Sequence, residues 1–296
     1  MRIVSLAPGA TEIICALGAG DMLVGRSHEC DWPERVRILP TCTRAAFSTQ
    51  MSSREIDTEV NRRLRAGEPL FHIDMDLIRE LKPDVLVAQE HCAVCAVTPG
   101  EVCGISGGRI VSVGASSVSG IYKDVMTIAE ALGKSKEGDA LVGRMQREFR
   151  ELNEKVREFR TPSVVVLEWT DPLFAMGNWG PELVEAANGR LLLGRPGEHS
   201  RAIPWQDLLA ADPEYLIIAP CGFDLTRAWD ERAVLEAATG WTQLQAVKRG
   251  NVFFADGNRY FNRSGMTVID TAQLIGEILH DLQPPIFVHA WRRIGD

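Results

Sequence analysis

The sequence lacks any apolar run that approaches the roughly 20 residues needed to cross a bilayer as a helix. It also lacks an excess of basic residues, because 32 Lys and Arg stand against 40 Asp and Glu, for a net charge of −8 at pH 7. Proteins that bind nucleic acids usually carry a basic face. We therefore expect neither membrane insertion nor a nucleic-acid partner.

The N-terminus lacks the pattern of a secretory signal peptide. Met1 and Arg2 lead straight into an apolar run at residues 3–6, without a charged n-region, an apolar h-region or a small-residue cleavage site. The seven cysteines are an odd number, which fits free thiols in a reducing compartment. We expect a cytoplasmic protein, and a periplasmic one only if the N-terminus has been truncated.

Motifs of catalysis are missing as well. The sequence has no G-x-S-x-G elbow and no H-E-x-x-H helix. The turn at residues 7–12 has neither the spacing of a dinucleotide fingerprint nor the Gly-Lys-Ser/Thr of a P-loop. Glu12, Glu29 and Glu168 are possible acids without an obvious partner. We expect a binding protein and not an enzyme.

Short apolar runs rich in Val and Ile alternate with segments of helical period. The runs predict strands at residues 3–6, 23–25, 85–88, 110–113, 164–167, 215–219 and 252–254. The segments between them predict helices at residues 11–17, 75–81, 122–132, 181–187, 233–238 and 268–280. This β-α order predicts an α/β fold with mainly parallel sheets.

Residues 136–160 form one continuous, highly charged helical pattern. Its apolar residues recur at steps of three and four: Leu141, Met145, Phe149, Leu152, Val156 and Phe159. Because a full set of strands and helices lies on either side, we interpret it as a rigid connector between two lobes; the alternative is a surface helix within one domain. The predicted domains are an N-terminal lobe at 1–116, a helical connector at 117–160 and a C-terminal lobe at 161–296.

A weak internal repeat supports two lobes. Residues 81–88 resemble residues 211–218, since each segment ends a helix before a Pro and then begins a buried strand. Each strand runs into a polar loop that contains cysteine. Ligands of open α/β sheets lie beyond the carboxyl ends of the strands, so we expect both loops to face one ligand cleft between the lobes.

Three cysteine and histidine residues form a possible metal or dithiol site. His91 precedes the C-x-x-C pair Cys92 and Cys95. A structural zinc site usually needs a second such pair, which the sequence does not have. Cys221, which follows another predicted strand, could complete a cluster or face the ligand. Metal binding and redox activity stay open as alternatives.

Aromatic side chains recur at the predicted strand ends. They are Trp32 after the second strand, Trp169 with Phe174, Phe223, and Tyr260 with Phe261. His28 lies beside Trp32 in the same loop. Rigid rings in loops offer a large contact area, which favours a flat or bulky ligand.

Several segments together resemble the substrate-binding proteins of ABC importers for cobalamin and iron complexes, whose two lobes are joined by one long helix. The resemblance covers essentially the whole chain and is strongest to the cobalamin-binding branch. Its segments are RIVSLAPGATE (2–12), GRSHECDWP (25–33), IxxLKPDVL (78–86), NWGPEL (178–183), and IPW (203–205) followed by LxxDP (209–213).

The resemblance implies a corrinoid held by both lobes. It places Pro8, Gly9, Glu29 and Trp32 against the ligand from the first lobe, with Gln89 and Cys92 nearby, and Trp169, Phe174, Tyr260 and Phe261 from the second. It also implies docking to importer membrane subunits through one acidic residue on each lobe. Asp76 matches the first position, whereas Asn262 stands uncharged at the second.

An insert at about residues 49–71, with four arginines, replaces the short loop that brings a Trp to the ligand in the transporter branch. Together with the N-terminus, these departures favour a cytosolic corrinoid carrier. The alternatives are an importer receptor for corrinoid, siderophore or haem, and a metal- or redox-active protein that uses Cys92 and Cys95.

Overall fold

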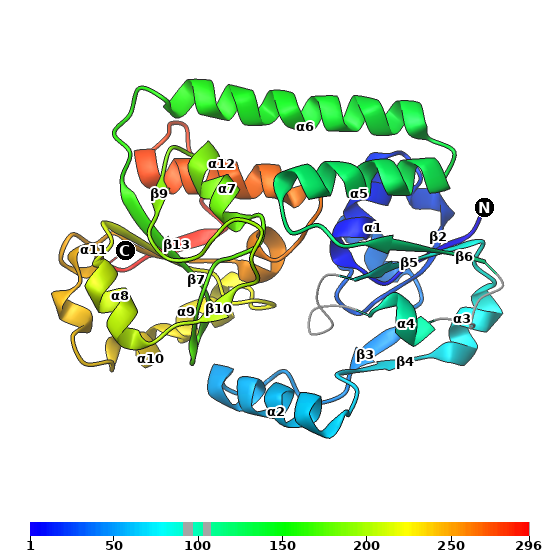
Figure 1. Ribbon diagram of the computed structural model, residues 1–296, viewed down its shortest axis with the longest axis horizontal. Helices are drawn as coiled ribbons and strands as arrows, with labels where there is room; N and C mark the ends of the chain where they lie inside the picture. The colour runs from blue at the N-terminus through cyan, green and yellow to red at the C-terminus, as the bar shows by residue number, and fades with distance from the viewer. Residues whose placement is uncertain (91–96, 103–107, 296) are drawn as a thin grey trace. The chain divides into compact units, whose positions relative to one another are not determined.

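The computed structural model describes residues 1–90, 97–102 and 108–295 and divides into two compact units. Unit 1 consists of Met1–Arg144 and Ser264–Met266, and unit 2 consists of Met145–Arg263 and Thr267–Asp296. Each unit has its own sheet with helices packed around it (Figure 1). The prediction of a two-lobe α/β fold is confirmed.

Unit 1 is built on a four-stranded parallel sheet in the order β2-β1-β5-β6. Its strands are β1 (Ile3–Ser5), β2 (Leu23–Arg26), β5 (Val85–Gln89) and β6 (Arg109–Val113). Every residue of β1 and β5 is buried, as the unbroken apolar runs predict for strands covered on both faces.

The helices of unit 1 begin at local signals. Pro8 occupies the first turn of α1, where its missing N–H costs no hydrogen bond, and Ser117 caps α5 by accepting from the N–H of Gly120 at 3.0 Å. The helical segments are α1 (Pro8–Ala16), η1 (Gly20–Met22), η2 (Glu34–Ile38), α3 (Met75–Leu81), α4 (Pro99–Val102) and α5 (Val118–Ala131).

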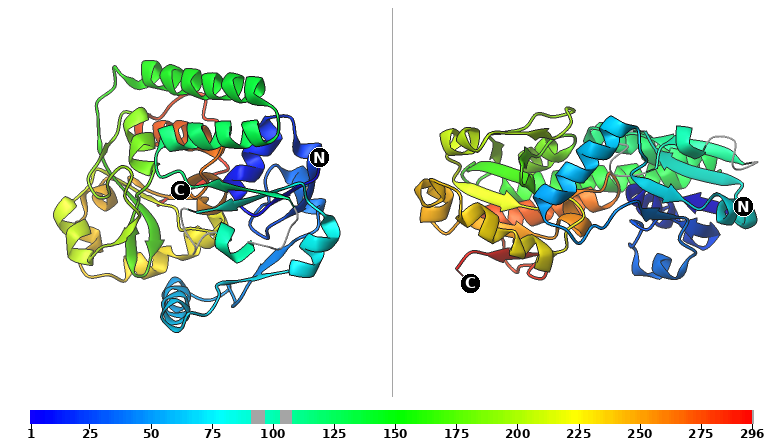
Figure 2. Two further views of the ribbon diagram at one scale, coloured as in Figure 1. Left: turned by 45° about the vertical axis from the view of Figure 1, so that its right-hand side comes forward. Right: turned by 90° about the horizontal axis from the view of Figure 1, so that it is seen from below.

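The insert after β2 folds into an arm. Strands β3 (Thr43–Ala45) and β4 (Phe71–Ile73) pair antiparallel and carry helix α2 (Ser53–Ala66) away from the four-stranded sheet (Figure 2). Ser52 and Glu55 form a capping box at its start, and Gly67 ends it with a φ of 64°. No helix was predicted here.

Helix α6 (Ser135–Val156) runs from unit 1 into unit 2, because the boundary between the units falls after Arg144. Four residues of its predicted apolar stripe are at most 6% exposed: Leu141, Met145, Leu152 and Val156. Phe149, also in the predicted stripe, is half-buried. The helix ends four residues before the predicted end at 160, and Phe159 is 46% exposed. The long helical connector therefore exists, slightly shorter than expected.

Unit 2 contains a mixed sheet in the order β10-β8-β7-β11-β12-β13, with β9 also pairing to β7. The strands are β7 (Ser163–Thr170), β8 (Leu173–Ala175), β9 (Arg190–Leu191), β10 (Arg201–Ala202), β11 (Tyr215–Ile218), β12 (Val252–Ala255) and β13 (Trp291–Arg293). The predicted strands β7, β11 and β12 are parallel, and the short outer strands β8, β10 and β13 are antiparallel additions.

The two segments of the internal repeat, residues 81–88 and 211–218, share the same backbone conformation at the end of the helix. Lys82 ends α3 at φ 45° and ψ 60°, and Asp212 ends α8 at φ 38° and ψ 62°, each just before a Pro and a buried strand. The helices of unit 2 are α7 (Gly180–Ala186), α8 (Trp205–Ala211), α9 (Leu225–Asp230), α10 (Arg232–Glu236), η3 (Trp241–Gln243), α11 (Gln245–Lys248), η4 (Gly257–Phe261) and α12 (Thr267–His280).

Candidate ligand-binding site

The carboxyl edge of the unit 1 sheet is where the loop after β2 meets β1. The backbone N–H of Ser27 donates to the carbonyl oxygen of Ser5 at 3.0 Å, and the thiol of Cys30 lies 3.2 Å from the hydroxyl of Ser27. Pro8 follows on the same edge, half-buried at the start of α1. The parallel order thus collects the predicted residues of this loop and of α1 on one edge.

His28 is held in unit 1 by a hydrogen bond at one ring nitrogen, and its other ring nitrogen is buried without a hydrogen bond. Nδ1 lies 2.7 Å from the hydroxyl of Thr43, and Nε2 is buried 3.2 Å from Oε1 of Glu29. Its ring also packs on Phe71, with centroids 5.5 Å apart. In this structure His28 joins the loop after β2 to the arm of the insert, and the contact of His28 and Glu29 with a ligand stays a prediction.

Trp32 is the most exposed aromatic residue of the predicted set. It is 40% exposed and lies in the loop after β2, so its ring can offer a flat apolar surface. Gln89 ends β5 and is only 9% exposed. His91, Cys92 and Cys95 lie outside the described residues. Within the described parts of the chain, no group of three or more His, Cys, Asp or Glu side chains is arranged to hold a metal ion.

The carboxyl edge of the unit 2 sheet carries a cluster of two rings and a guanidinium. The rings of Trp169, on β7, and Phe223, after β11, have centroids 5.1 Å apart, and the guanidinium carbon of Arg227 lies 3.6 Å from the centroid of Phe223. Burial lowers the pKa of Arg227 from its usual value. This cluster places an apolar ring and a cation within one site; no motif in the sequence pointed to Arg227.

Phe174 lies opposite Trp169 in the antiparallel pairing of β7 with β8, and both side chains are half-buried. Cys221 is also half-buried in the loop after β11. Phe261, by contrast, is 0% exposed and fills the core of unit 2. Of the predicted residues on this edge, Trp169, Phe174 and Cys221 therefore have accessible surface, and Phe261 has none.

Tyr260 adds a hydroxyl group to this edge, besides the guanidinium of Arg227. It is 8% exposed, its ring meets Phe287 edge-on at 5.8 Å, and its hydroxyl lies 3.1 Å from Nε2 of His289. Burial raises the pKa of Tyr260, so the phenol stays neutral at physiological pH. The sequence had singled out Tyr260 but not His289, which is 29 residues away and reaches it only through tertiary folding.

Backbone hydrogen bonds join the loops of this edge into one surface. The N–H of Asn258 donates to the carbonyl oxygen of Phe223, and the N–H of Asp256 donates to that of Ala290, both at 2.9 Å. The N–H of Cys221 donates to the carbonyl oxygen of Glu168 at 3.0 Å. The loops after β7, β11 and β12 and the segment before β13 are therefore fixed relative to one another.

The two predicted docking residues differ in character. The side chain of Asp76 is 95% exposed on α3, with an ion pair to Arg79 at 2.7 Å. The side-chain amide of Asn262 instead donates to the carbonyl oxygen of Gly257 at 2.6 Å, which closes the turn η4. Asp76 thus presents a charge to solvent, and Asn262 serves the local backbone.

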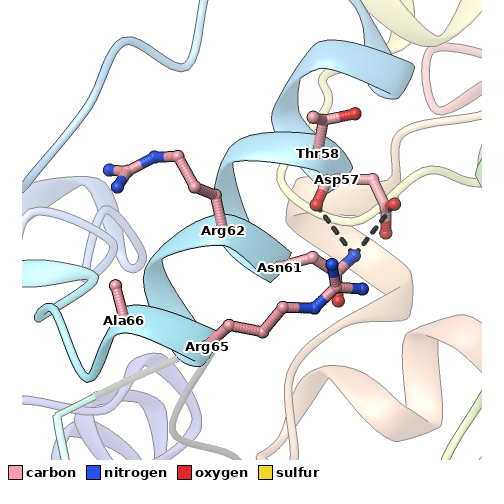
Figure 3. A pocket seen from close by; sticks show the side chains of 6 residues that line it. All are labelled: Asp57, Thr58, Asn61, Arg62, Arg65 and Ala66. Carbon is pink, nitrogen blue, oxygen red and sulfur yellow. Dashed lines mark hydrogen bonds between the residues drawn. The ribbon is translucent and has the colours of Figure 1, made fainter.

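A hollow of about 630 Å³ borders helix α2 (Figure 3). Asn61 donates to the carbonyl and carboxylate oxygens of Asp57, and Arg62 forms ion pairs with Glu59 and Glu68. Hydrogen bonds from Arg62 and Arg63 lower the pKa of Glu59 to about 2. None of the six residues that line the hollow is aromatic: Asp57, Thr58, Asn61, Arg62, Arg65 and Ala66. This surface suits polar contacts and not the stacking of a flat ligand.

The family model described as periplasmic binding protein matches residues 3–258. A Bacillus subtilis (strain 168) protein, the uncharacterized ABC transporter substrate-binding lipoprotein YvrC, is 24% identical over 283 residues, which cover 94% of this chain and 80% of that protein. The similarity predicted from the sequence motifs is confirmed.

Solved structures share the fold. A periplasmic heme-binding protein from Pseudomonas aeruginosa superposes with a TM-score of 0.75 at 17% identity, covering 99% of this chain and 97% of that one. The periplasmic vitamin B12-binding protein BtuF of Vibrio cholerae gives a TM-score of 0.66 at 18% identity, covering 96% and 98%.

The expectation of a cytoplasmic protein is wrong. It rested on the missing signal pattern and the odd cysteine count, whereas the matching family model is that of periplasmic binding proteins and the curated relative is a lipoprotein of an ABC transporter. The idea of a cytosolic carrier falls with it. No helix among the residues that the structure describes is long and apolar enough to cross a membrane.

Proposed function

We propose that this chain, which belongs to the periplasmic binding protein family, is the substrate-binding receptor of an ABC importer for a large planar metal chelate. The substrate that we favour is a corrinoid related to cobalamin. The protein would bind this ligand and deliver it without chemical change. Its partners would be the small molecule and the membrane subunits of the importer.

The observation that carries this proposal is the set of rings at the carboxyl edges of the two sheets. Trp32 is 40% exposed beside the unit 1 sheet, and the half-buried ring of Trp169 packs at a tilt of 60° against the buried ring of Phe223 at the unit 2 sheet. Ring faces pack well on a flat macrocycle, and Arg227 adds a guanidinium for polar groups on its rim. Open α/β sheets bind their ligands at this edge.

The named neighbours support the ligand class. One solved structure of the same fold is a vitamin B12-binding protein and another is a heme-binding protein. Both ligands are large macrocycles with a central metal. For docking, we propose that the exposed carboxylate of Asp76 meets a basic residue of the importer. Unit 1 would then supply the charged contact with the membrane subunits.

Haem is the second candidate, and a specific observation favours it. Tyr260 and His289 offer a phenol and an imidazole 3.1 Å apart on the unit 2 edge. Both groups serve as protein ligands to haem iron in known proteins.

Titration with cyanocobalamin and, separately, with hemin tests the proposal. We expect quenching of tryptophan fluorescence and one-to-one binding of one of the two, seen by equilibrium dialysis. Trp32→Ala and Trp169→Ala should each raise Kd by about 10-fold, which is about 1.4 kcal/mol.

Ile38→Ala is the matched control for Trp32→Ala. Ile38 is 89% exposed in η2, six residues beyond Trp32, and is not placed at the strand end. Its Kd should equal that of the wild type. Failure of both probes to bind at a defined stoichiometry would overturn the proposal. An equal change of Kd in all three variants would show that the two tryptophan rings do not contact the ligand.

A further inference from the structure

His289 has one ring nitrogen fixed and the other unused. Nε2 lies 3.1 Å from the hydroxyl of Tyr260, and the side chain as a whole is exposed. Nδ1 makes no hydrogen bond with any described residue. The imidazole is therefore held in one orientation with Nδ1 open to a ligand.

The position of His289 follows from the pairing of the last strand. β13 runs antiparallel to β12, with Ala255 opposite Trp291, so the residues just before β13 lie at the carboxyl end of β12. The hydrogen bond from the N–H of Asp256 to the carbonyl oxygen of Ala290 fixes this placement. His289 therefore lies on the same edge of the unit 2 sheet as Trp169 and Phe223.

The surroundings of Tyr260 hold the pair rigidly. The tyrosine ring is wedged against Phe287, and the guanidinium carbon of Arg259 lies 5.0 Å from its centroid. Glu277 accepts hydrogen bonds from the N–H groups of Ile286 and Phe287, which anchors the segment that carries His289. A histidine oriented through its second nitrogen by an oxygen atom is the usual arrangement of a metal ligand.

His28, the other histidine beside a predicted ring, has the opposite arrangement. Its Nδ1 lies 2.7 Å from the hydroxyl of Thr43 and its Nε2 is buried 3.2 Å from Oε1 of Glu29, so neither nitrogen is open to a ligand as the structure stands. Among these two residues, only His289 can coordinate a metal as the structure stands.

We propose that Nδ1 of His289 is the axial ligand to the metal of the bound chelate and that Tyr260 is its positioning residue. The inference rests on the proposed function and adds to it the atom that meets the metal. The Nδ1 lone pair replaces a water molecule on the metal, and the proton stays on Nε2, which donates to the tyrosine hydroxyl. The ligand class is then a metal macrocycle with an exchangeable axial position.

Two probes with exchangeable axial water test this coordination: aquocobalamin and hemin. With the wild-type protein, we expect the absorbance bands of an imidazole complex. His289→Ala should abolish these bands and lower the affinity at least 10-fold, and added imidazole should restore the bands. Tyr260→Phe should keep the imidazole bands but lower the affinity about 10-fold and shift the pH at which they form.

His72→Ala is the control, because His72 is exposed on β4 of unit 1. It should behave as the wild type. If neither probe binds to the wild type, the proposed function fails and this inference falls with it. If a probe binds but its spectrum is the same with and without His289, only the assignment of the axial ligand is overturned.

Discussion

Gly9 and Gly265 lie backbone against backbone. A Cβ added at Gly9 would lie 2.7 Å from the carbonyl carbon of Ser264, and one added at Gly265 would lie 2.7 Å from Cα of Gly9. Gly9 stands in the first turn of α1, and Gly265 lies in the short segment that joins η4 to α12. Each residue must be glycine for the other to keep its place, which gives Gly9 a packing role whether or not it also meets a ligand.

Gly265→Ala should therefore destabilise the protein by about 1–3 kcal/mol, because the added methyl group must displace backbone atoms. Urea unfolding measures the loss. Gly100→Ala is the control, since a Cβ there meets no atom within 4 Å and the residue lies in helix α4. Equal stability of the two variants would contradict the close approach.

Lys82 and Asp212 adopt the same left-handed conformation, but only at Lys82 should a substitution by glycine make the protein more stable. Lys82→Gly should raise the free energy of unfolding by about 0.5–1 kcal/mol, because glycine takes this conformation without steric cost. Asp212→Gly relieves the same cost but loses the carboxylate that accepts from the N–H of Gln245 at 2.6 Å, which is worth about 1 kcal/mol. Chemical denaturation should show a higher free energy of unfolding for Lys82→Gly than for the wild type, and little or no increase for Asp212→Gly.

Glu277 holds the C-terminal segment through a buried carboxylate. Its oxygens accept from the N–H of Ile286 at 2.6 Å, from that of Phe287 at 3.1 Å and from the indole N–H of Trp291 at 3.0 Å. Glu277→Gln should cost about 2 kcal/mol, because an amide cannot accept all three bonds. Amide hydrogen exchange at residues 286–291 should become faster, and exchange in α1 should not. Glu236→Gln, on an exposed position of α10, should change neither.

His280 should make the protein sensitive to acid. Burial lowers the pKa of His280 below its usual 6.5, and its Nε2 donates to the carbonyl oxygen of Ala187 at 2.8 Å. The unfolded chain thus takes up the proton at a higher pH than the folded chain, so stability falls as the pH drops below about 6.5. Melting temperatures at pH 7 and pH 5 should differ less in His280→Gln than in the wild type. The same pH dependence in both proteins would exclude His280 as the cause, and exposed His72→Gln should match the wild type.

Much of the fold could be predicted because its signals are local. The strands β1, β2, β5, β6, β7, β11 and β12 and the helices α3, α6 and α12 all appear where apolar runs and periodicity place them. Helix α2 was missed although Ser52 and Glu55 carry a capping-box pattern, because its few apolar residues give no stripe to bury.

The site was harder to predict, because its contacts are made between distant residues. The expectation that ligand residues follow strand ends placed Trp169 and Phe223 on one edge of the unit 2 sheet, where their ring centroids lie 5.1 Å apart. It could not place His289, whose position depends on the three-residue strand β13 pairing with β12. It also could not separate Tyr260 from Phe261, which are neighbours in sequence but differ in that only Phe261 is wholly enclosed.

The division of the chain has a consequence for its biosynthesis. Unit 1 includes Ser264–Met266, and Gly265 packs on the start of α1. A ribosome that has made all of residues 1–144 has not yet supplied this piece. The packing of unit 1 therefore cannot be complete until residue 266 has been made, and a nascent chain that stops before this residue lacks the segment that packs on Gly9.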